Sequence, residues 1–169
     1  MIEGKVTTVF GDDINTDDII PARVLQQSFE QAFFAEHAFA AFDPGFRGRC
    51  AAHPANIVVA GRNFGCGSSR EQAVYALARN NVVCVVARSF PDIFYRNALT
   101  NGLVLVAVPD VSALAEGDLL TVDLDRGVVV NQACRGAPIP FDMPAGDRAI
   151  FKAGGRVGPV RSHLAELLA

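Results

Sequence analysis

The chain has 169 residues, of which 50% are hydrophobic and 20% are charged, so its composition is that of one folded domain and not of a disordered protein. The formal net charge is −3, which argues against a nucleic-acid or anionic-membrane binder because such proteins carry a basic surface. No apolar stretch is long enough to predict a transmembrane helix, and the N-terminus lacks the basic-then-apolar pattern of a signal peptide. We therefore expect a cytoplasmic protein with neither a membrane nor a nucleic acid as its partner.

The cysteines are spread along the chain at separations of 16, 18 and 50 positions, and no two of them form a C-x-x-C pair. They are Cys50, Cys66, Cys84 and Cys134. The histidines, which we interpret as surface or helix residues, show no metal-ligand spacing either: His37, His53 and His163. Because zinc and iron–sulfur sites need clustered ligands, we predict that this chain alone holds no metal ion and no cluster.

The N-terminal third is predicted to begin with a strand at residues 5–10, where β-branched side chains are frequent. Residues 11–18 contain Gly, Asn and four Asp, and these residue types favour a loop. Residues 28–42 carry five Phe at near-helical spacing, which predicts a helix with one apolar face. We expect these Phe side chains in the core or at a subunit interface, and they are candidates to drive homo-oligomers of the isolated chain. Residues 43–55, with Pro, Gly and Arg, are predicted to form a surface loop.

The central third alternates short apolar runs, typical of strands buried on both faces, with helical patterns. The predicted strands are residues 57–60, 82–87 and 103–108. A Gly-rich turn at 61–69 precedes a helix over 70–80, and a second helix is expected to start with Ser89 as its cap and to stop at Gly102. This strand–helix–strand–helix–strand order predicts a right-handed parallel α/β unit.

The C-terminal third is predicted to contain a β-hairpin and a helical tail. Residues 119–124 and 128–130 flank Asp125-Arg126-Gly127, a sequence typical of a tight turn. From Pro144 onward we expect one or two short helices, interrupted at Gly154-Gly155 because glycine weakens a helix. The fold class is therefore α/β with some antiparallel content.

The Gly-rich turn carries the most informative chemistry. Gly65 and Gly67 permit positive φ angles and close approach to a ligand. We expect Ser68 or Ser69 to cap the following helix, whose free backbone N–H groups then suit a carboxylate or phosphate. Arg70 adds a planar fork for a carboxylate. The plainer alternative is a tight turn before a helix with no further role.

The turn does not match other motifs that bind phosphate or carry a nucleophile. A Walker loop needs a Lys that is absent here, and Gly65-Cys66-Gly67 is followed by Ser-Ser-Arg where a dinucleotide fingerprint needs a third Gly. The G-x-S-x-G nucleophile elbow is also missing. By themselves these residues thus leave two interpretations, an anion site of another kind and a plain tight turn before a helix.

Taken whole, residues 64–71 (Phe-Gly-Cys-Gly-Ser-Ser-Arg-Glu) resemble the signature of the small subunit, or swivelling domain, of the aconitase superfamily, with the isopropylmalate dehydratases as the most similar branch. Residues 11–21 are similar to the family's N-terminal loop, and residues 87–98 to the start of its second helix. Phe141-Asp142 and residues 152–155 together form a fourth and weaker match to the family. The segments occur in the family's order, which makes the resemblance specific.

The resemblance covers about residues 5–155 and implies a single aconitase-type swivelling domain of β/β/α layers over 1–169, with residues 156–169 as a helical tail. Enzymes of this family move a hydroxyl between neighbouring carbons of a di- or tricarboxylate by eliminating water and adding it back. A [4Fe–4S] cluster with one open iron binds the substrate, and in two-chain members a separate large subunit holds it. The resemblance thus implies a hydro-lyase subunit that is active only with a large subunit.

By its position in the signature, Ser68 resembles the family's catalytic base, which takes a proton from carbon as an alkoxide. An ordinary serine hydroxyl is too weak for this, so backbone N–H groups and a cation have to stabilise its charged form. Ser69 and Arg70 resemble carboxylate-binding residues. Asp17 matches a position lining the same cleft, and its alternative is a turn or cap residue. Structural roles are expected for Cys66 and Asn97, and no catalytic role is assigned to Gln72.

The loop of residues 23–27 is expected to select the substrate side chain, as the corresponding loop does in the family. Gln26 is neutral at a position where a cation would favour an extra carboxylate, so we expect an alkyl-malate such as isopropylmalate, although Arg23 is near enough in sequence to reach the site. One apolar contact changes discrimination by only about 1–3 kcal/mol. The alternatives are a related hydro-lyase for citramalate, dimethylmalate or homoaconitate, and a non-catalytic regulatory module that binds anions.

Overall fold

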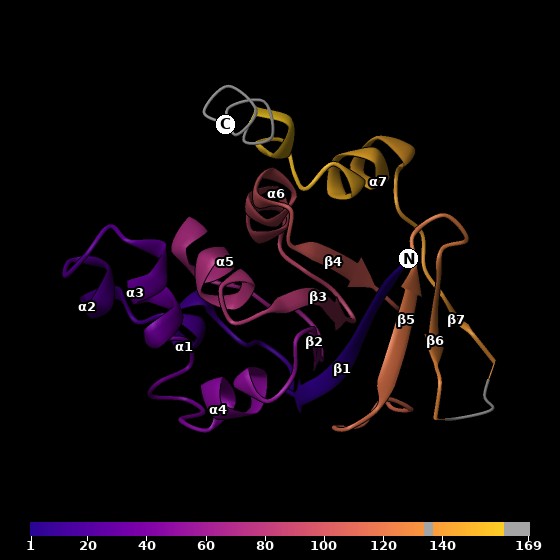
Figure 1. Ribbon diagram of the computed structural model, residues 1–169, viewed down its shortest axis with the longest axis horizontal. Helices are drawn as coiled ribbons and strands as arrows, with labels where there is room; N and C mark the ends of the chain where they lie inside the picture. The colour runs from indigo at the N-terminus through magenta and orange to yellow at the C-terminus, as the bar shows by residue number, and fades with distance from the viewer. Residues whose placement is uncertain (134–136, 161–169) are drawn as a thin grey trace.

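The computed structural model describes residues 1–133 and 137–160, which contain a mixed sheet with the strand order β4-β3-β2-β1-β5-β6-β7. Figure 1 shows the parallel strands next to most of the helices and the antiparallel strands at the other end of the sheet. The parallel strands are β1 (Ile2–Val9), β2 (Asn56–Ala60), β3 (Val82–Ala87) and β4 (Val104–Ala107). The antiparallel strands are β5 (Leu119–Asp123), β6 (Val128–Asn131) and β7 (Ile139–Pro140). The predicted parallel unit and hairpin are confirmed, and β7 is an addition that the sequence pattern does not indicate.

The helices of the described residues are α1 (Thr16–Ile19), α2 (Ala22–Leu25), α3 (Gln31–Glu36), α4 (Phe46–Ala51), α5 (Glu71–Ala78), α6 (Asp92–Asn101) and α7 (Ala145–Lys152). Figure 1 shows α1–α5 grouped on one side of the parallel strands. An ion pair joins α7 to the turn between β5 and β6. Among the residues that the structure describes, no helix is long and apolar enough to cross a membrane.

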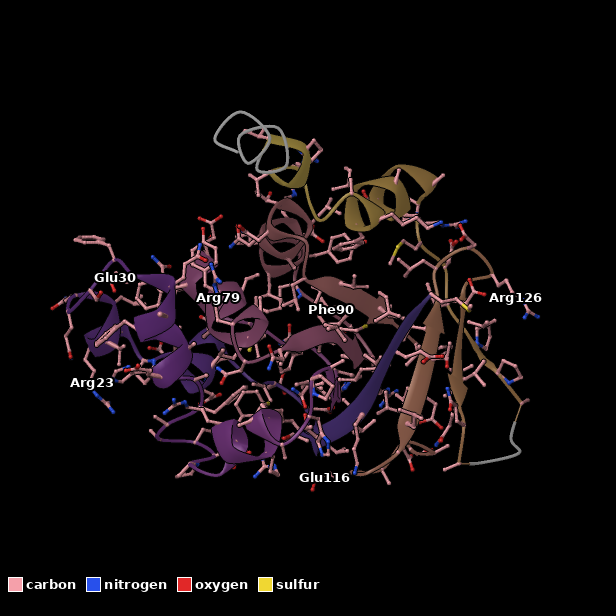
Figure 2. All side chains as sticks on the ribbon, in the orientation of Figure 1. Arg23, Glu30, Arg79, Phe90, Glu116 and Arg126 are labelled. Atoms are coloured by element: carbon pink, nitrogen blue, oxygen red, sulfur yellow. The ribbon has the colours of Figure 1, made fainter. Side chains whose placement is uncertain are left out.

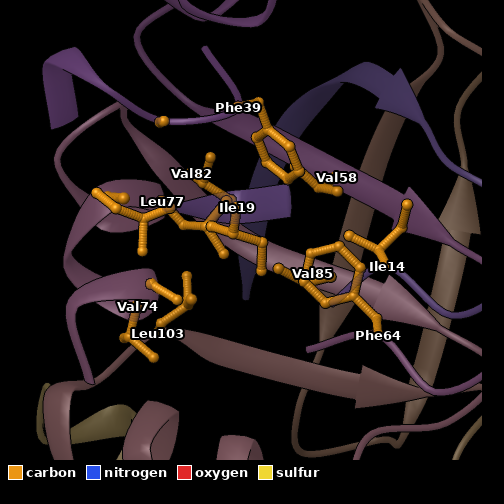
Figure 3. Close-up of a cluster of buried hydrophobic side chains, with 14 of the residues drawn as sticks. Ile14, Ile19, Phe39, Val58, Phe64, Val74, Leu77, Val82, Val85 and Leu103 are labelled. Carbon is orange, nitrogen blue, oxygen red and sulfur yellow. The ribbon is translucent and has the colours of Figure 1, made fainter. Parts of the chain in front are cut away.

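Both faces of the parallel strands are covered, because successive side chains of a strand point to opposite faces. In β2, Val58 and Ala60 belong to a first core with side chains from α1–α5, whereas Ile57 and Val59 belong to a second core on the opposite face. Figure 3 shows the first core, which includes Phe39. The strands are thereby anchored on two sides, and the loops that leave their ends start from fixed positions.

The predicted helix over residues 28–42 is wrong, because α3 is much shorter and residues 37–42 form turns. Phe39 has a φ angle of 53°, which no α-helix accommodates. Its buried ring lies 4.7 Å from that of Phe46, measured between ring centroids. The chain thus leaves the helix to bring Phe39 into the core, whereas Phe29 is 99% exposed.

The prediction that residues 43–55 form only a surface loop is also wrong, because α4 lies among them. Phe46 and Cys50 are four positions apart on α4 and are both buried in the first core. Burial of these two side chains outweighs the low helix propensity of the intervening Gly48.

Neither of the predicted serine caps is present. Arg70 is the N-cap of α5 and Pro91 is the N-cap of α6, and neither makes a side-chain capping hydrogen bond. Ser89 instead accepts a hydrogen bond from the backbone N–H of Asn63, at 2.8 Å. The predicted end of α6 at Gly102 is confirmed, since Gly102 adopts the left-handed conformation with φ of 79°.

The predicted interruption at Gly154-Gly155 is confirmed, because both residues follow α7 and have positive φ angles of 77° and 89°. A Cβ atom on Gly155 would lie 2.4 Å from the backbone nitrogen of Gly102, so the glycine lets the chain pass closely over the end of α6. Residues 158–160 are helical. The remainder of the predicted tail, together with Cys134 and His163, lies outside the described residues.

Candidate active site

The candidate site lies at the carboxyl ends of β1 and β2, which are parallel neighbours in the sheet. The loop of residues 10–15 leaves β1, and the Gly-rich turn of residues 61–70 leaves β2. Loops at this edge of a parallel sheet converge on the ligand in many α/β proteins. The sheet therefore brings the Gly-rich turn, which carries Ser68, Ser69 and Arg70, next to the loop that leads into α1, where Asp17 lies.

Backbone hydrogen bonds join these two loops directly. The N–H of Gly65 donates to the carbonyl of Ile14 at 2.7 Å, and the N–H of Thr16 donates to the carbonyl of Cys66 at 2.8 Å. Asn15 and Cys66 also form a parallel β-bridge. The turn is thus held as an extension of the sheet and not as an independent surface loop.

Side chains at the base of the loops add to this connection. The Arg62 guanidinium donates two hydrogen bonds to Asp12, at 2.9 and 3.0 Å, and the amide of Asn63 donates to Asp13 at 2.8 Å. Hydrogen bonds from Arg62 hold the pKa of the Asp12 carboxyl below its usual range, mainly through the Arg62 backbone N–H. Asp12 therefore stays ionised and continues to bind Arg62 in mildly acidic solution.

Phe64 and Gly65 fix the first half of the turn. The Phe64 side chain is fully buried, and its ring packs edge-on against Phe94 at a centroid distance of 5.7 Å. Gly65 has a φ of 84°, and a Cβ atom there would lie 2.3 Å from the Phe94 ring. A glycine is therefore required at position 65 by both backbone conformation and space.

The second half of the turn is open to solvent. Ser68 and Ser69 are both exposed. Within the described residues, no hydrogen bond uses the N–H groups of Gly67, Ser68 or Ser69. These N–H groups and the uncapped start of α5 offer donors to an anion, and the carboxylate or phosphate site expected here stays a prediction.

Arg70, the last residue of the Gly-rich turn, is paired with Asp17 of α1. Its Nη1 atom lies 2.5 Å from Oδ1 of Asp17 and also donates to the Ile20 carbonyl at 3.2 Å. The Arg70 side chain is 12% exposed and that of Asp17 is 55% exposed. No contact of the described chain uses Nε or Nη2 of Arg70, so this edge of the guanidinium keeps two parallel N–H groups for a second carboxylate.

Asp17 also accepts a hydrogen bond from the backbone N–H of Ala22 at 3.0 Å, which supports the start of α2. The hydrogen bond from Arg70 is the main reason that the pKa of the Asp17 carboxyl lies below its ordinary value. Asp17 thus contacts both Arg70 of the turn and the backbone at the start of α2, and its role in binding substrate stays a prediction.

The structure does not bring Arg23 or Gln26 to the Ser68 turn. Both residues are exposed to solvent. Arg23 lies on α2, and Gln26 is the C-cap of α2. Figure 2 shows Arg23 at the edge of the molecule, pointing away from it. Within the described residues, no contact joins either side chain to the turn. Their roles in substrate selection stay predictions.

The cysteines do not form a metal site in the described part of the chain, and no group of three or more His, Cys, Asp or Glu side chains there is arranged to hold a metal ion. Cys66 is the member nearest to Ser68, and its thiol donates to the carbonyl of Asp13 at 3.5 Å. Partial burial raises the pKa of the Cys66 thiol, so it stays protonated. The donors within residues 1–133 and 137–160 do not fit an iron–sulfur cluster.

Two features of the site are missed by sequence reasoning. Asn15 caps α1 and forms a reciprocal capping box with Asp18, a pattern that the Asn-x-x-Asp spacing signals. Thr16 donates its hydroxyl to the carbonyl of Ser68 at 3.0 Å. No local pattern predicts this second contact, because its partners are 52 positions apart.

Known proteins of one family are similar to this chain. The family described as the aconitase C-terminal domain matches residues 47–110. Proteins named 3-isopropylmalate dehydratase small subunit are similar over nearly the whole chain. That of Heliobacterium modesticaldum is 40% identical over 93% of both chains, and that of Desulfovibrio desulfuricans is 42% identical over 98% of both.

A solved structure gives the same result in three dimensions. The crystal structure of 3-isopropylmalate dehydratase from Methanocaldococcus jannaschii superposes with a TM-score of 0.83 at 36% identity, covering 98% of this chain and 96% of the other. The expected aconitase-type α/β fold is thereby confirmed. On these identities and coverages, the chain belongs to the family of 3-isopropylmalate dehydratase small subunits, within the aconitase superfamily.

Proposed function

We propose that this chain is the small subunit of a two-subunit hydro-lyase that converts 2-isopropylmalate to 3-isopropylmalate by removing and re-adding water. The observation that carries the proposal is the exposed Ser68 turn with its free N–H groups, held beside the Arg70–Asp17 pair. The family membership supplies the reaction class.

In this proposal Ser68 is the catalytic base. Its alkoxide takes a proton from the substrate carbon, so an O–H bond forms as the C–H bond breaks. The electron pair left on carbon becomes the C=C bond, and the hydroxyl on the neighbouring carbon leaves as hydroxide, which takes a proton from solvent to become water. In the second half of the reaction a water gives a proton to solvent and adds as hydroxide to the carbon that lost its proton. The carbon that lost its hydroxyl takes the proton held by Ser68, which regenerates the alkoxide. The free backbone N–H groups around Ser68 lower the cost of its charged form.

Arg70 and Ser69 bind a substrate carboxylate. The Nε and Nη2 edge of Arg70 offers a two-pronged contact, and the exposed Ser69 hydroxyl adds one more donor. Asp17 balances the charge of Arg70 and restrains its Nη1 side. This restraint means that the guanidinium is oriented before the substrate arrives, which reduces the entropy lost on binding.

The large subunit is proposed to supply the [4Fe–4S] cluster, since the donors described in this chain do not fit one. When bound, such a cluster acts as a Lewis acid toward the substrate hydroxyl and carboxylate. This chain then contributes the base and one carboxylate site, and the two subunits together complete the active site.

The substrate side chain is proposed to be alkyl because Gln26 is neutral. Turnover is best compared on isopropylmalate, citramalate and homoaconitate. We expect a preference for isopropylmalate, and a preference for the tricarboxylate would contradict the role given to Gln26 and favour the homoaconitate alternative.

The proposal is tested by purifying the chain with and without its large subunit and following the absorbance of the unsaturated intermediate. The complex should turn over isopropylmalate, the chain alone should not, and Ser68→Ala should lower kcat by about 100-fold or more. Ser112→Ala, an exposed serine on the connection between β4 and β5, is the matched control and should leave kcat unchanged. Full activity of Ser68→Ala, or activity without the large subunit, would contradict the proposal.

A further inference from the structure

Thr16 contacts the Gly-rich turn at two alternate carbonyls. Its backbone N–H donates to the Cys66 carbonyl at 2.8 Å, and its hydroxyl donates to the Ser68 carbonyl at 3.0 Å. The residue is 1% exposed and is the first residue of α1. The two bonds therefore lie on either side of Gly67, the residue that gives the turn its flexibility.

The positions of these carbonyls determine where the next N–H groups point. In a trans peptide the C=O and N–H groups point in opposite directions. With the Cys66 and Ser68 carbonyls held toward Thr16, the N–H groups of Gly67 and Ser69 point away from α1. Both are among the amides that make no hydrogen bond in the described residues.

The backbone at Gly67 would not hold this arrangement alone. Gly67 has a φ of 92° and is exposed, so the backbone has wide freedom there. A Cβ atom on Gly67 would lie 3.5 Å from the Thr16 hydroxyl, so the turn already lies against this side chain. The pair of bonds from one buried side chain is thus what limits rotation of the two peptide groups.

We propose that Thr16 is a positioning residue that aims the Gly67 and Ser69 N–H groups at the site where negative charge develops beside Ser68. This inference rests on the proposed function. Thr16 touches no reacting atom and acts through the turn. Donors that are oriented in advance stabilise an oxyanion without reorganising during the reaction.

Three variants test the proposal in the complex with the large subunit. Thr16→Val keeps the shape but removes the hydroxyl, and we expect kcat to fall roughly 10-fold to 100-fold with KM within about threefold. Thr16→Ser restores the donor and should keep kcat within about threefold of the wild type. Thr100→Val removes a comparable hydroxyl bond, from Thr100 to the Arg96 carbonyl on α6, and should leave kcat unchanged.

A measurement on the wild-type chain is independent of how the variants fold. The Gly67 and Ser69 amides should exchange hydrogen rapidly, while those of Thr16 and Gly65 should be protected, because only the second pair is hydrogen-bonded. Protection of the Gly67 and Ser69 amides would overturn the inference, as would a Thr16→Val complex with wild-type kcat or a Thr16→Ser complex as slow as Thr16→Val. An inactive wild-type complex would instead count against the proposed function alone.

Discussion

In the parallel half of the sheet, the loops that leave β1 and β2 emerge at the same edge, whereas in the antiparallel half the chain reverses at each turn. The first arrangement places the loop of residues 10–15 against the turn of residues 61–70 and joins them by backbone bonds. The turn between β5 and β6 contacts α7 instead. The parallel half thus positions the candidate site, and the antiparallel half supports the C-terminal helix.

The two halves also differ in how far their ion pairs are exposed to solvent. Arg70 pairs with Asp17 in the parallel half, and the Arg70 side chain is 12% exposed. Lys152 pairs with Asp125 in the antiparallel half, where both side chains are exposed to 44% or more. Because solvent screens the pair of Lys152 and Asp125, we expect that pair to contribute little to stability. We expect the pair of Arg70 and Asp17 to fix the orientation of the Arg70 side chain.

The largest effect is expected from Gly65→Ala in the parallel half. The new methyl group would meet the Phe94 ring, and the φ of 84° disfavours any side chain. We expect the free energy of unfolding to fall by about 2–4 kcal/mol, measured by urea denaturation. Gly117→Ala is the matched control, since Gly117 has a φ of 91° but open space around it, and should cost only about 1 kcal/mol. Equal losses would show that the contact with Phe94 is unimportant.

Arg70→Lys tests whether the site needs a fork or only a positive charge. Lysine carries a single ammonium group and lacks the planar fork of arginine. It therefore cannot contact Asp17 and at the same time make a two-pronged contact with a substrate carboxylate. We expect kcat/KM of the complex to fall about 10-fold to 100-fold. Arg126→Lys, at the exposed tip of the β5–β6 turn shown in Figure 2, should leave it unchanged. Equal activity of both variants would break the distinction between the two halves.

The pH dependence of Asp17 gives a smaller effect. Its pKa is lowered from 3.8, chiefly by the hydrogen bond from Arg70. Because the folded-state pKa is the lower one, the stabilisation is fully present above the unfolded value and is lost as pH falls through the folded value. NMR titration should therefore show Asp17 ionising below 3.8, the ordinary value. In Arg70→Ala its pKa should rise toward that value, and an unchanged pKa would contradict the pairing.

The smallest effect is expected from Lys152→Ala. Removing this exposed partner of Asp125 should change the free energy of unfolding by less than about 1 kcal/mol and leave kcat/KM of the complex as it was. Thermal unfolding and the isopropylmalate assay check the two statements. A lower kcat/KM for Lys152→Ala would mean that α7 and the antiparallel half affect the candidate site.

The central elements were predictable because their signal is local. The apolar run Ile57–Ala60 is buried on both faces, as its lack of polar alternation indicates, and Gly102 ends α6 as a left-handed residue. The helix over residues 28–42 was not predictable in this way, because Phe39 turns into the core against the helical period. Burial of one large ring there outweighs local propensity.

For this protein, the sequence alone determined the parallel α/β class, the family, and the residues of the turn from Phe64 to Arg70 that carry the candidate chemistry. Only the tertiary structure decided that Arg70 pairs with Asp17, and that Thr16 holds the Ser68 carbonyl. Both contacts join residues about 50 positions apart, and they exist because parallel strands β1 and β2 bring their following loops to one edge of the sheet. Strands and turns follow from the types of neighbouring residues, whereas a contact between distant residues depends on how the whole chain packs.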